Sequence, residues 1–314
     1  RYPGLTDEQC LEKICEVEDV DVEDILTPEE IRKQEDLSGE YNKFVRVIER
    51  GNGQKAFLRI YDDNYRHPSE TEITAALKRM VVKSPLVAFL TGHGERNING
   101  AGERDYYAFS QYKSFRNSLV NQGFNCISLS LDSLDAIPND VDILVISDIR
   151  TSLLDREQKI IENYVGEGRN LLIAGEPRRQ EQMNPLLALF GLKFMPGILV
   201  QESKDFSADL ILASATQAAS ELSRSFYRMA RYGSKATMPT AVEIRQVEEK
   251  GFTLTPLLMT DSTGTWNELE TTNFIEDTAR VNPAIGEIEK AYATMLYLTR
   301  QINGKEQRVI VLGD

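Results

Sequence analysis

The stretch LVAFLTGHGE, residues 86–95, decides the fold class of this chain. Its first five residues are all apolar, which is typical of a strand that is buried on both faces of a parallel sheet. A glycine-rich loop follows directly. The pattern therefore predicts a central strand with a loop at its carboxyl end.

Four more apolar runs follow, at residues 124–129, 141–146, 170–174 and 308–312. Helices are predicted between them, at residues 105–121, 155–167 and 180–190. Strands that alternate with helices specify parallel βαβ units. The sequence therefore predicts an α/β domain over residues 83–314, with a flavodoxin-like, doubly wound and mostly parallel sheet that the last run rejoins.

Residues 192–284 break this alternation. Short strand-like pieces lie between polar segments, and they either extend the main sheet or form an irregular insertion. Residues 263–284 are predicted to be a long loop that carries Trp266, the only tryptophan. An indole in such a loop either contacts a partner or anchors the loop by packing.

Residues 1–82 are predicted to form a smaller α+β region. Helix-start patterns occur at Thr6, Thr27 and Ser69, each with acidic residues in the next turn. Two β-rich runs flank Gly51-Asn52-Gly53, which predicts a hairpin.

The leading segment, residues 1–40, holds 14 acidic and 4 basic residues and so carries −10 of the net charge of −13. This balance disfavours nucleic acid as a partner, because phosphate binding needs a basic surface. The acidic run 16–24 lacks the turn glycine of an EF-hand loop, so no metal site is predicted there.

The three cysteines, Cys10, Cys15 and Cys126, show no ligand-like spacing with histidine. A Cys10–Cys15 disulfide stays open only if that segment is not a regular helix. The chain starts without methionine and stops directly after an apolar run, so we expect it to belong to a longer protein. No apolar run approaches the roughly 20 residues that span a bilayer, and the flanks of that protein could hold membrane segments.

Ligands of open α/β sheets gather at the carboxyl ends of strands, near the point where the strand order reverses. Four polar segments are predicted to meet at that edge, at residues 91–102, 147–150, 175–178 and 313–314. The candidate ligand- or partner-binding residues are Thr91, His93, Glu95, Arg96, Asp148, Arg150, Glu176, Arg178 and, from the long loop, Trp266.

His93 has two interpretations. It is either a general base or metal ligand that acts with nearby carboxylates, or it holds the loop with Glu95 through hydrogen bonds to the backbone. No catalytic residue, metal or cofactor is predicted. Residues 92–97 match neither a Walker loop nor a dinucleotide turn, no Gly-x-Ser-x-Gly elbow occurs, and Cys126 falls inside a predicted strand.

An ordered set of motifs now points to a family. The set consists of the run into Thr91-Gly-His-Gly-Glu95, the turn Gly123-Phe124, residues 137–146 and 152–154, Gly168-Arg-Asn-Leu-Leu-Ile-Ala-Gly-Glu-Pro177, Thr265-Trp266 and residues 307–314. Over about residues 40–314 the chain resembles the accessory, substrate-binding-like subunits of ABC-2-type transporters, the GldG-like family linked to gliding motility in Bacteroidetes.

The resemblance implies a soluble region on the extracytoplasmic (periplasmic) side of the membrane, anchored by segments outside this chain. It implies permease and ATPase subunits as partners, and a partner protein, a glycan or an exported substrate as ligand. It also implies a sheet like that of GIFT domains and class I amidotransferases, without the amidotransferase nucleophile. Two alternatives stay open, which are a structural scaffold of a membrane complex and a hydrolase or amidotransferase relative that uses His93 with Glu95 or Glu176.

Overall fold

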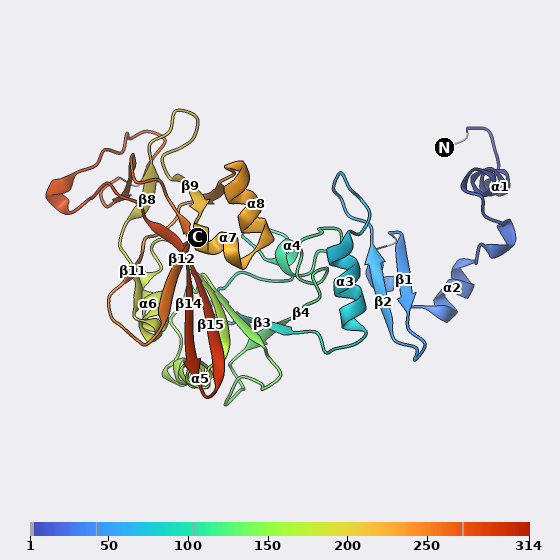
Figure 1. The fold of residues 1–314 in the computed structure, drawn as a ribbon, viewed down its shortest axis with the longest axis horizontal. Coiled ribbons are helices and arrows are strands. Elements are labelled where there is room, and N and C mark those ends of the chain that lie inside the picture. The colour runs from blue at the N-terminus through green and yellow to red at the C-terminus, as the bar shows by residue number, and fades with distance from the viewer. Residues whose placement is uncertain (1–2, 42, 103, 272) are drawn as a thin grey trace.

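The computed structural model describes residues 3–41, 43–102, 104–271 and 273–314. Within these residues, nine strands form one large mixed sheet (Figure 1). They are β3 (Leu86–Thr91), β4 (Asn125–Ser130), β5 (Ile143–Ser147), β6 (Asn170–Ala174), β9 (Leu210–Ala215), β10 (Ala236–Pro239), β12 (Thr253–Met259), β14 (Ala293–Ile302) and β15 (Lys305–Leu312). Their order across the sheet is β10-β9-β12-β14-β15-β6-β5-β3-β4.

The prediction of a mostly parallel sheet is wrong. The half from β4 to β15 is parallel throughout, and β15 does rejoin it beside β6. The half from β15 to β10 is antiparallel. The reason is the long strand β14, which turns tightly into β15 at Asn303-Gly304, where both residues have positive φ as a two-residue hairpin requires.

The two faces of the sheet are covered differently. Helices α5 (Asp155–Gly166) and α6 (Gln180–Leu187) pack with the main apolar core, which includes Leu144, Ile173 and Val311. Phe89 and Val145 point to the other face, where Ile98 and Tyr106 cover them. Because side chains alternate along a strand, each buried strand contributes to both cores.

The predicted helix at 105–121 is also wrong, because only α4 (Tyr107–Ser110) is helical there. The rest is a series of turns. The Asn121 amide donates to the carbonyls of Lys113 and Phe115, two acceptors that a continuing helix would use for its own ladder.

The segment 192–284 both extends the sheet, through β9, β10 and β12, and forms two small sheets beside it. In these, β7 (Leu192–Phe194) pairs with β11 (Ile244–Gln246), and β8 (Ile198–Gln201) pairs with β13 (Thr265–Glu268). Trp266 therefore lies in a strand, and the prediction of a loop over all of 263–284 is wrong at its start. Helices α7 (Gln217–Leu222) and α8 (Arg224–Tyr232) lie between β9 and β10.

The N-terminal elements begin where the capping patterns predict. They are α1 (Asp7–Glu18), α2 (Pro28–Gln34), the hairpin of β1 (Val45–Glu49) and β2 (Lys55–Arg59), and α3 (Glu70–Arg79). In Figure 1 they extend to the right of the main sheet, with α1 farthest from it. Cys10 and Cys15 lie on the regular helix α1 and are both free thiols.

Candidate functional site

The carboxyl ends of β3, β5, β6 and β15 meet at one edge of the sheet. Since β4 and β5 flank β3 on opposite sides, the strand order reverses between β3 and β5. Open α/β sheets bind ligands in the crevice at such a point. The predicted edge residues do gather here, but in three separate groups.

The first group is built around His93. Its Nε2 lies 3.0 Å from a carboxylate oxygen of Glu157 at the start of α5, and its Nδ1 lies 3.4 Å from Glu95. Glu95 also accepts a hydrogen bond from the backbone N–H of His93. The His93 carbonyl accepts from the backbone N–H groups of Arg150 and Thr151. These bonds join the loop after β3 to the loop after β5 at the switch point.

This geometry favours the loop-holding interpretation of His93. The imidazole is buried between two carboxylates. The Glu157 carboxylate also accepts a hydrogen bond from the backbone N–H of Leu154. Asp148 and Glu176, the other expected metal partners, belong to the other groups. Within the described ranges, no group of three or more His, Cys, Asp or Glu side chains is placed to hold a metal ion.

The second group centres on Glu176, whose side chain is buried. One carboxylate oxygen accepts from Arg96, and the other lies 2.7 Å from Arg104. The guanidinium of Arg96 also lies over the Tyr106 ring, 5.4 Å from its centroid. Asp314, at the end of β15, adds a second carboxylate: burial and then the charge of Glu176 raise its pKa to about 6.

That raised pKa makes a testable prediction. The folded chain holds the Asp314 proton more tightly than the unfolded chain, whose pKa is near 3.8, so this contribution to stability is present below that value and is lost as the pH rises through 6. Asp314→Asn keeps the neutral form at every pH. Between about pH 4.5 and 7 the variant should gain about 2 kcal/mol in unfolding free energy relative to the parent chain. Urea titrations at both pH values measure this gain, and a difference that does not change with pH would contradict it.

The third group joins Asp148 to Arg150 and Arg179. Asp148 follows β5 in a left-handed backbone conformation and is almost fully buried. Its carboxylate lies 3.4 Å from Arg150 and 3.1 Å from Arg179. Arg178, the predicted residue, instead lines a separate cavity of about 280 Å³ with Glu268.

Trp266 lies apart from the edge. It is 3% exposed, and its indole N–H donates to Glu268 at 3.0 Å. Trp266 lines an open groove of about 660 Å³ together with residues of two largely exposed segments, Glu202–Ala208 and Phe274–Arg280. We call this the aromatic groove, because Phe206 and Phe274 also line it. It is larger than the four other cavities considered among the described residues, and neither His93 nor Glu176 lines any of these five.

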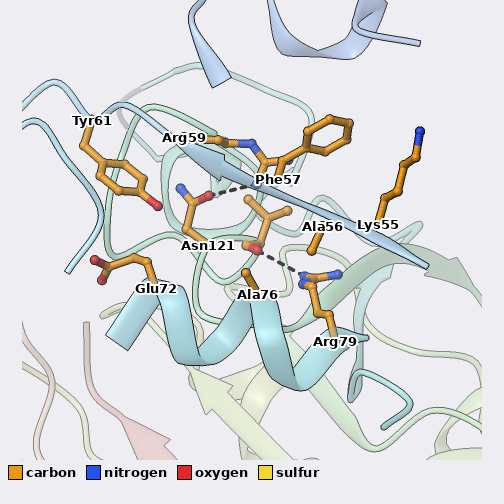
Figure 2. A pocket seen from close by; sticks show the side chains of 10 residues that line it. Lys55, Ala56, Phe57, Arg59, Tyr61, Glu72, Ala76, Arg79 and Asn121 are labelled. Atoms are coloured by element: carbon orange, nitrogen blue, oxygen red, sulfur yellow. Dashed lines mark hydrogen bonds between the residues drawn. The ribbon is translucent and has the colours of Figure 1, made fainter. Parts of the chain in front are cut away.

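A second cavity, the seam cavity, lies between β2 and α3 and has a volume of about 150 Å³ (Figure 2). Arg59 faces it from β2 and Arg79 from α3. Both guanidiniums are engaged with the main domain, since Arg59 donates to Asn121 and Arg79 donates to the carbonyl of Val120. Burial, and then the charge of Arg59, lower the pKa of Arg79. The cavity therefore marks the place where the N-terminal region is tied to the segment before β4.

Three charged partners of the edge groups were not among the predicted residues, namely Arg104, Glu157 and Arg179. Arg104 and Glu157 lie outside the segments that directly follow strands, which was the only signal used. Arg179 lies one residue beyond such a segment. Glu157 is the third residue of the helix that begins at Asp155, but Leu154 precedes that helix where a capping pattern would need Ser or Thr, so no sequence pattern marks it.

The fold defines the class of protein: it is a mixed α/β protein built on one large sheet. The chain belongs to the family described as an ABC-type uncharacterized transport system, whose sequence model matches residues 84–314. It is therefore a transport accessory protein by family. A comparison with curated proteins found no significant match.

Solved structures show only distant likeness. The mmIFT52 N-terminal domain is 14% identical, with a TM-score of 0.47 over 73% of this chain and 86% of that one. The exo-beta-1,4-mannosidase Op5Man5 from Opitutaceae bacterium strain TAV5 is 14% identical, with a TM-score of 0.36 over 76% of this chain and 33% of that one. A ThuA-like protein from Parabacteroides merdae is 9% identical, with a TM-score of 0.38 over 73% of this chain and 79% of that one.

Proposed function

We propose that this chain is a non-catalytic, extracytoplasmic accessory domain of an ABC-2-type transporter of the GldG-like kind. In this proposal the flavodoxin-like half of the sheet, which has the strand order 2-1-3-4-5 in its parallel part, is a scaffold. The domain binds a segment of a partner subunit or of the exported substrate. Transport energy comes from a separate ATPase subunit, because the chain carries no nucleotide motif that we recognise.

The observation that carries the proposal is that the buried carboxylates at the switch point already have partners within the chain. Glu157 contacts His93, Asp148 pairs with Arg150, and Glu176 pairs with Arg96. A ligand entering the crevice would have to displace the ion pairs of Asp148 and Glu176 and the hydrogen bond between His93 and Glu157, and breaking such buried contacts is costly. The edge therefore suits a rigid support better than a ligand pocket.

The aromatic groove is the surface that we assign to binding. It is open, it is larger than the other cavities described, and aromatic rings stand beside charged groups such as Lys204 and Asp277. Aromatic side chains are enriched at protein interfaces, where they bury large apolar areas. Phe206 is half exposed, which leaves apolar area to bury in a complex.

Two other functions receive less support. An enzyme that uses His93 needs a nucleophile or substrate beside the imidazole, whereas the ring contacts Glu95 and Glu157. A pure scaffold would bind through a flat surface and would not need the groove.

No helix within the described part of the chain is both long and apolar enough to cross a bilayer. The membrane anchor in this proposal therefore lies outside the residues shown. The test is to purify the full-length protein from its own membranes and to quantify the permease and ATPase subunits that accompany it.

We expect both subunits at a fixed ratio to the accessory protein. The double variant Phe206→Ser/Phe274→Ser should reduce their recovery about tenfold, while exposed Tyr65→Ser should not. Recovery of neither subunit with the parent protein would contradict the proposal.

A further inference from the structure

Helix α8 has two chemically different faces. Phe226 and Met229 pack against an apolar core that contains Ile211 and Met238 of the antiparallel half-sheet. The opposite face carries three arginines and two tyrosines at positions that helical spacing places on one side. These residues, which we call the α8 arginine face, are Arg224, Tyr227, Arg228, Arg231 and Tyr232.

The α8 arginine face is exposed, and no described residue forms a salt bridge with its arginines. Tyr227 is 48% exposed and Tyr232 is 70% exposed. Among the residues that the structure describes, no carboxylate lies within 4 Å of the Arg224, Arg228 or Arg231 guanidinium, and Arg231 donates only to the Tyr227 hydroxyl at 3.2 Å. Four arginines of the sheet edge, Arg96, Arg104, Arg150 and Arg179, are in contrast paired with acids.

A concentration of free positive charge is unexpected in a chain of net charge −13. The acidic leading segment lies at the right-hand end of the molecule, away from α8, which lies nearer the middle (Figure 1). Positive and negative charge are thus separated in the molecule, with a basic face on an acidic protein. Such a dipole orients a protein at a negatively charged surface.

We infer that the α8 arginine face rests on the headgroups of anionic phospholipids. Each arginine near an anionic bilayer contributes about 1 kcal/mol, and tyrosines favour the headgroup level because the ring is amphipathic. The apolar face of α8 is already packed on its own core, so the helix does not insert into the acyl layer. The contact is therefore peripheral, electrostatic and sensitive to salt.

An acidic protein or a nucleic acid is the competing class of partner. The lipid surface is favoured because the two exposed tyrosines flank a short row of arginines, which matches a flat interface and offers no groove for a chain. The inference rests on the proposed function only because that function places a membrane beside the domain. The test below uses no transporter subunit, so its failure would leave the co-purification result untouched.

The experiment measures sedimentation of residues 1–314 with vesicles of phosphatidylcholine alone or mixed with phosphatidylglycerol. We expect binding only to the mixed vesicles, and release by added salt. The variant Arg224→Gln/Arg228→Gln/Arg231→Gln should bind about 100-fold more weakly, given about 1 kcal/mol for each arginine. The control Lys33→Gln/Lys78→Gln/Lys305→Gln removes the same charge from exposed positions elsewhere and should bind like the parent chain.

The salt titration of the parent chain needs no variant, so the inference stays testable if the triple arginine variant does not fold. Absence of binding to the mixed vesicles would overturn it. Equal binding to neutral vesicles, or equal loss in the lysine control, would overturn it as well. Binding of soluble polyglutamate or of DNA by the α8 arginine face, without vesicle binding, would assign the face to the competing class.

Discussion

Glu176→Ala is expected to lower the free energy of unfolding by about 3 kcal/mol, the cost typical of breaking a buried ion pair by removing one partner. Glu176 is the shared acceptor of Arg96 and Arg104. The Arg96 side chain is only 15% exposed, so its charge would lose its hydrogen-bonded acceptor in a poorly solvated place, with only the Asp314 carboxylate of the same group left nearby. The loss should appear as a lower urea midpoint with an unchanged slope.

The control for this prediction is Glu306→Ala, because the Glu306 carboxylate is exposed and pairs with exposed Arg308. Exposed ion pairs contribute about 0.5 kcal/mol, so the control should be close to the parent chain. The variant Glu176→Gln keeps the volume and should recover part of the loss through hydrogen bonds. Equal stability of Glu176→Ala and Glu306→Ala would show that the edge group does not hold the sheet edge.

Arg116→Ala is expected to have a similar effect, about 3 kcal/mol, at the junction with the N-terminal region. The Arg116 guanidinium donates to Asp63 at 2.6 Å and to Glu72 at 2.6 Å, and it lies 4.4 Å from the centre of the Tyr61 ring. Asp63 and Glu72 raise the pKa of Arg116, and the hydrogen bond from Arg116 contributes most to lowering the pKa of Asp63 to about 2. Removing the arginine leaves the buried Glu72 without its cation.

Limited proteolysis separates this effect from global unfolding. In Arg116→Ala the β1–β2 hairpin and α3 should be cleaved first, because the segment before β4 then holds them less tightly, with Arg59 and Arg79 still bonded to it. Arg32→Ala is the matched control, since Arg32 is exposed and bonds only to the neighbouring turn at Glu29. Cleavage that starts instead in the main sheet would contradict this interpretation of the junction.

The sequence predicted local structure well where the signal was local. Capping residues such as Thr27 and Ser69 gave helix starts that the structure confirms, and the uniformly apolar runs gave the parallel strands. The antiparallel half was missed although Asn303-Gly304 is a strong hairpin signal. The helix at 105–121 failed because Asn121 captures backbone carbonyls, which is a tertiary effect that periodicity does not show.

The sequence predicted where the polar residues of the candidate site lie, but not which side chains pair with them there. Strand-end positions correctly brought His93, Asp148 and Glu176 to one edge of the sheet. Their partners come from helix α5 or from loop positions such as Arg104 and Arg179, and side-chain pairing over such distances leaves no spacing signal in one sequence. The division into residues 1–82 and 83–314 stays a prediction, as does a binding role for each of the nine candidate residues, Thr91 among them.

Photo-crosslinking in intact membranes tests the central claim most directly. A photoreactive phenylalanine analogue replaces Phe206 beside the aromatic groove in the full-length protein, and a matched sample carries it at exposed Tyr65, away from the groove. The account predicts that the Phe206 position crosslinks to a transporter subunit or to exported substrate and that the Tyr65 position does not. The absence of any such product at Phe206, or the same products from both positions, would contradict it.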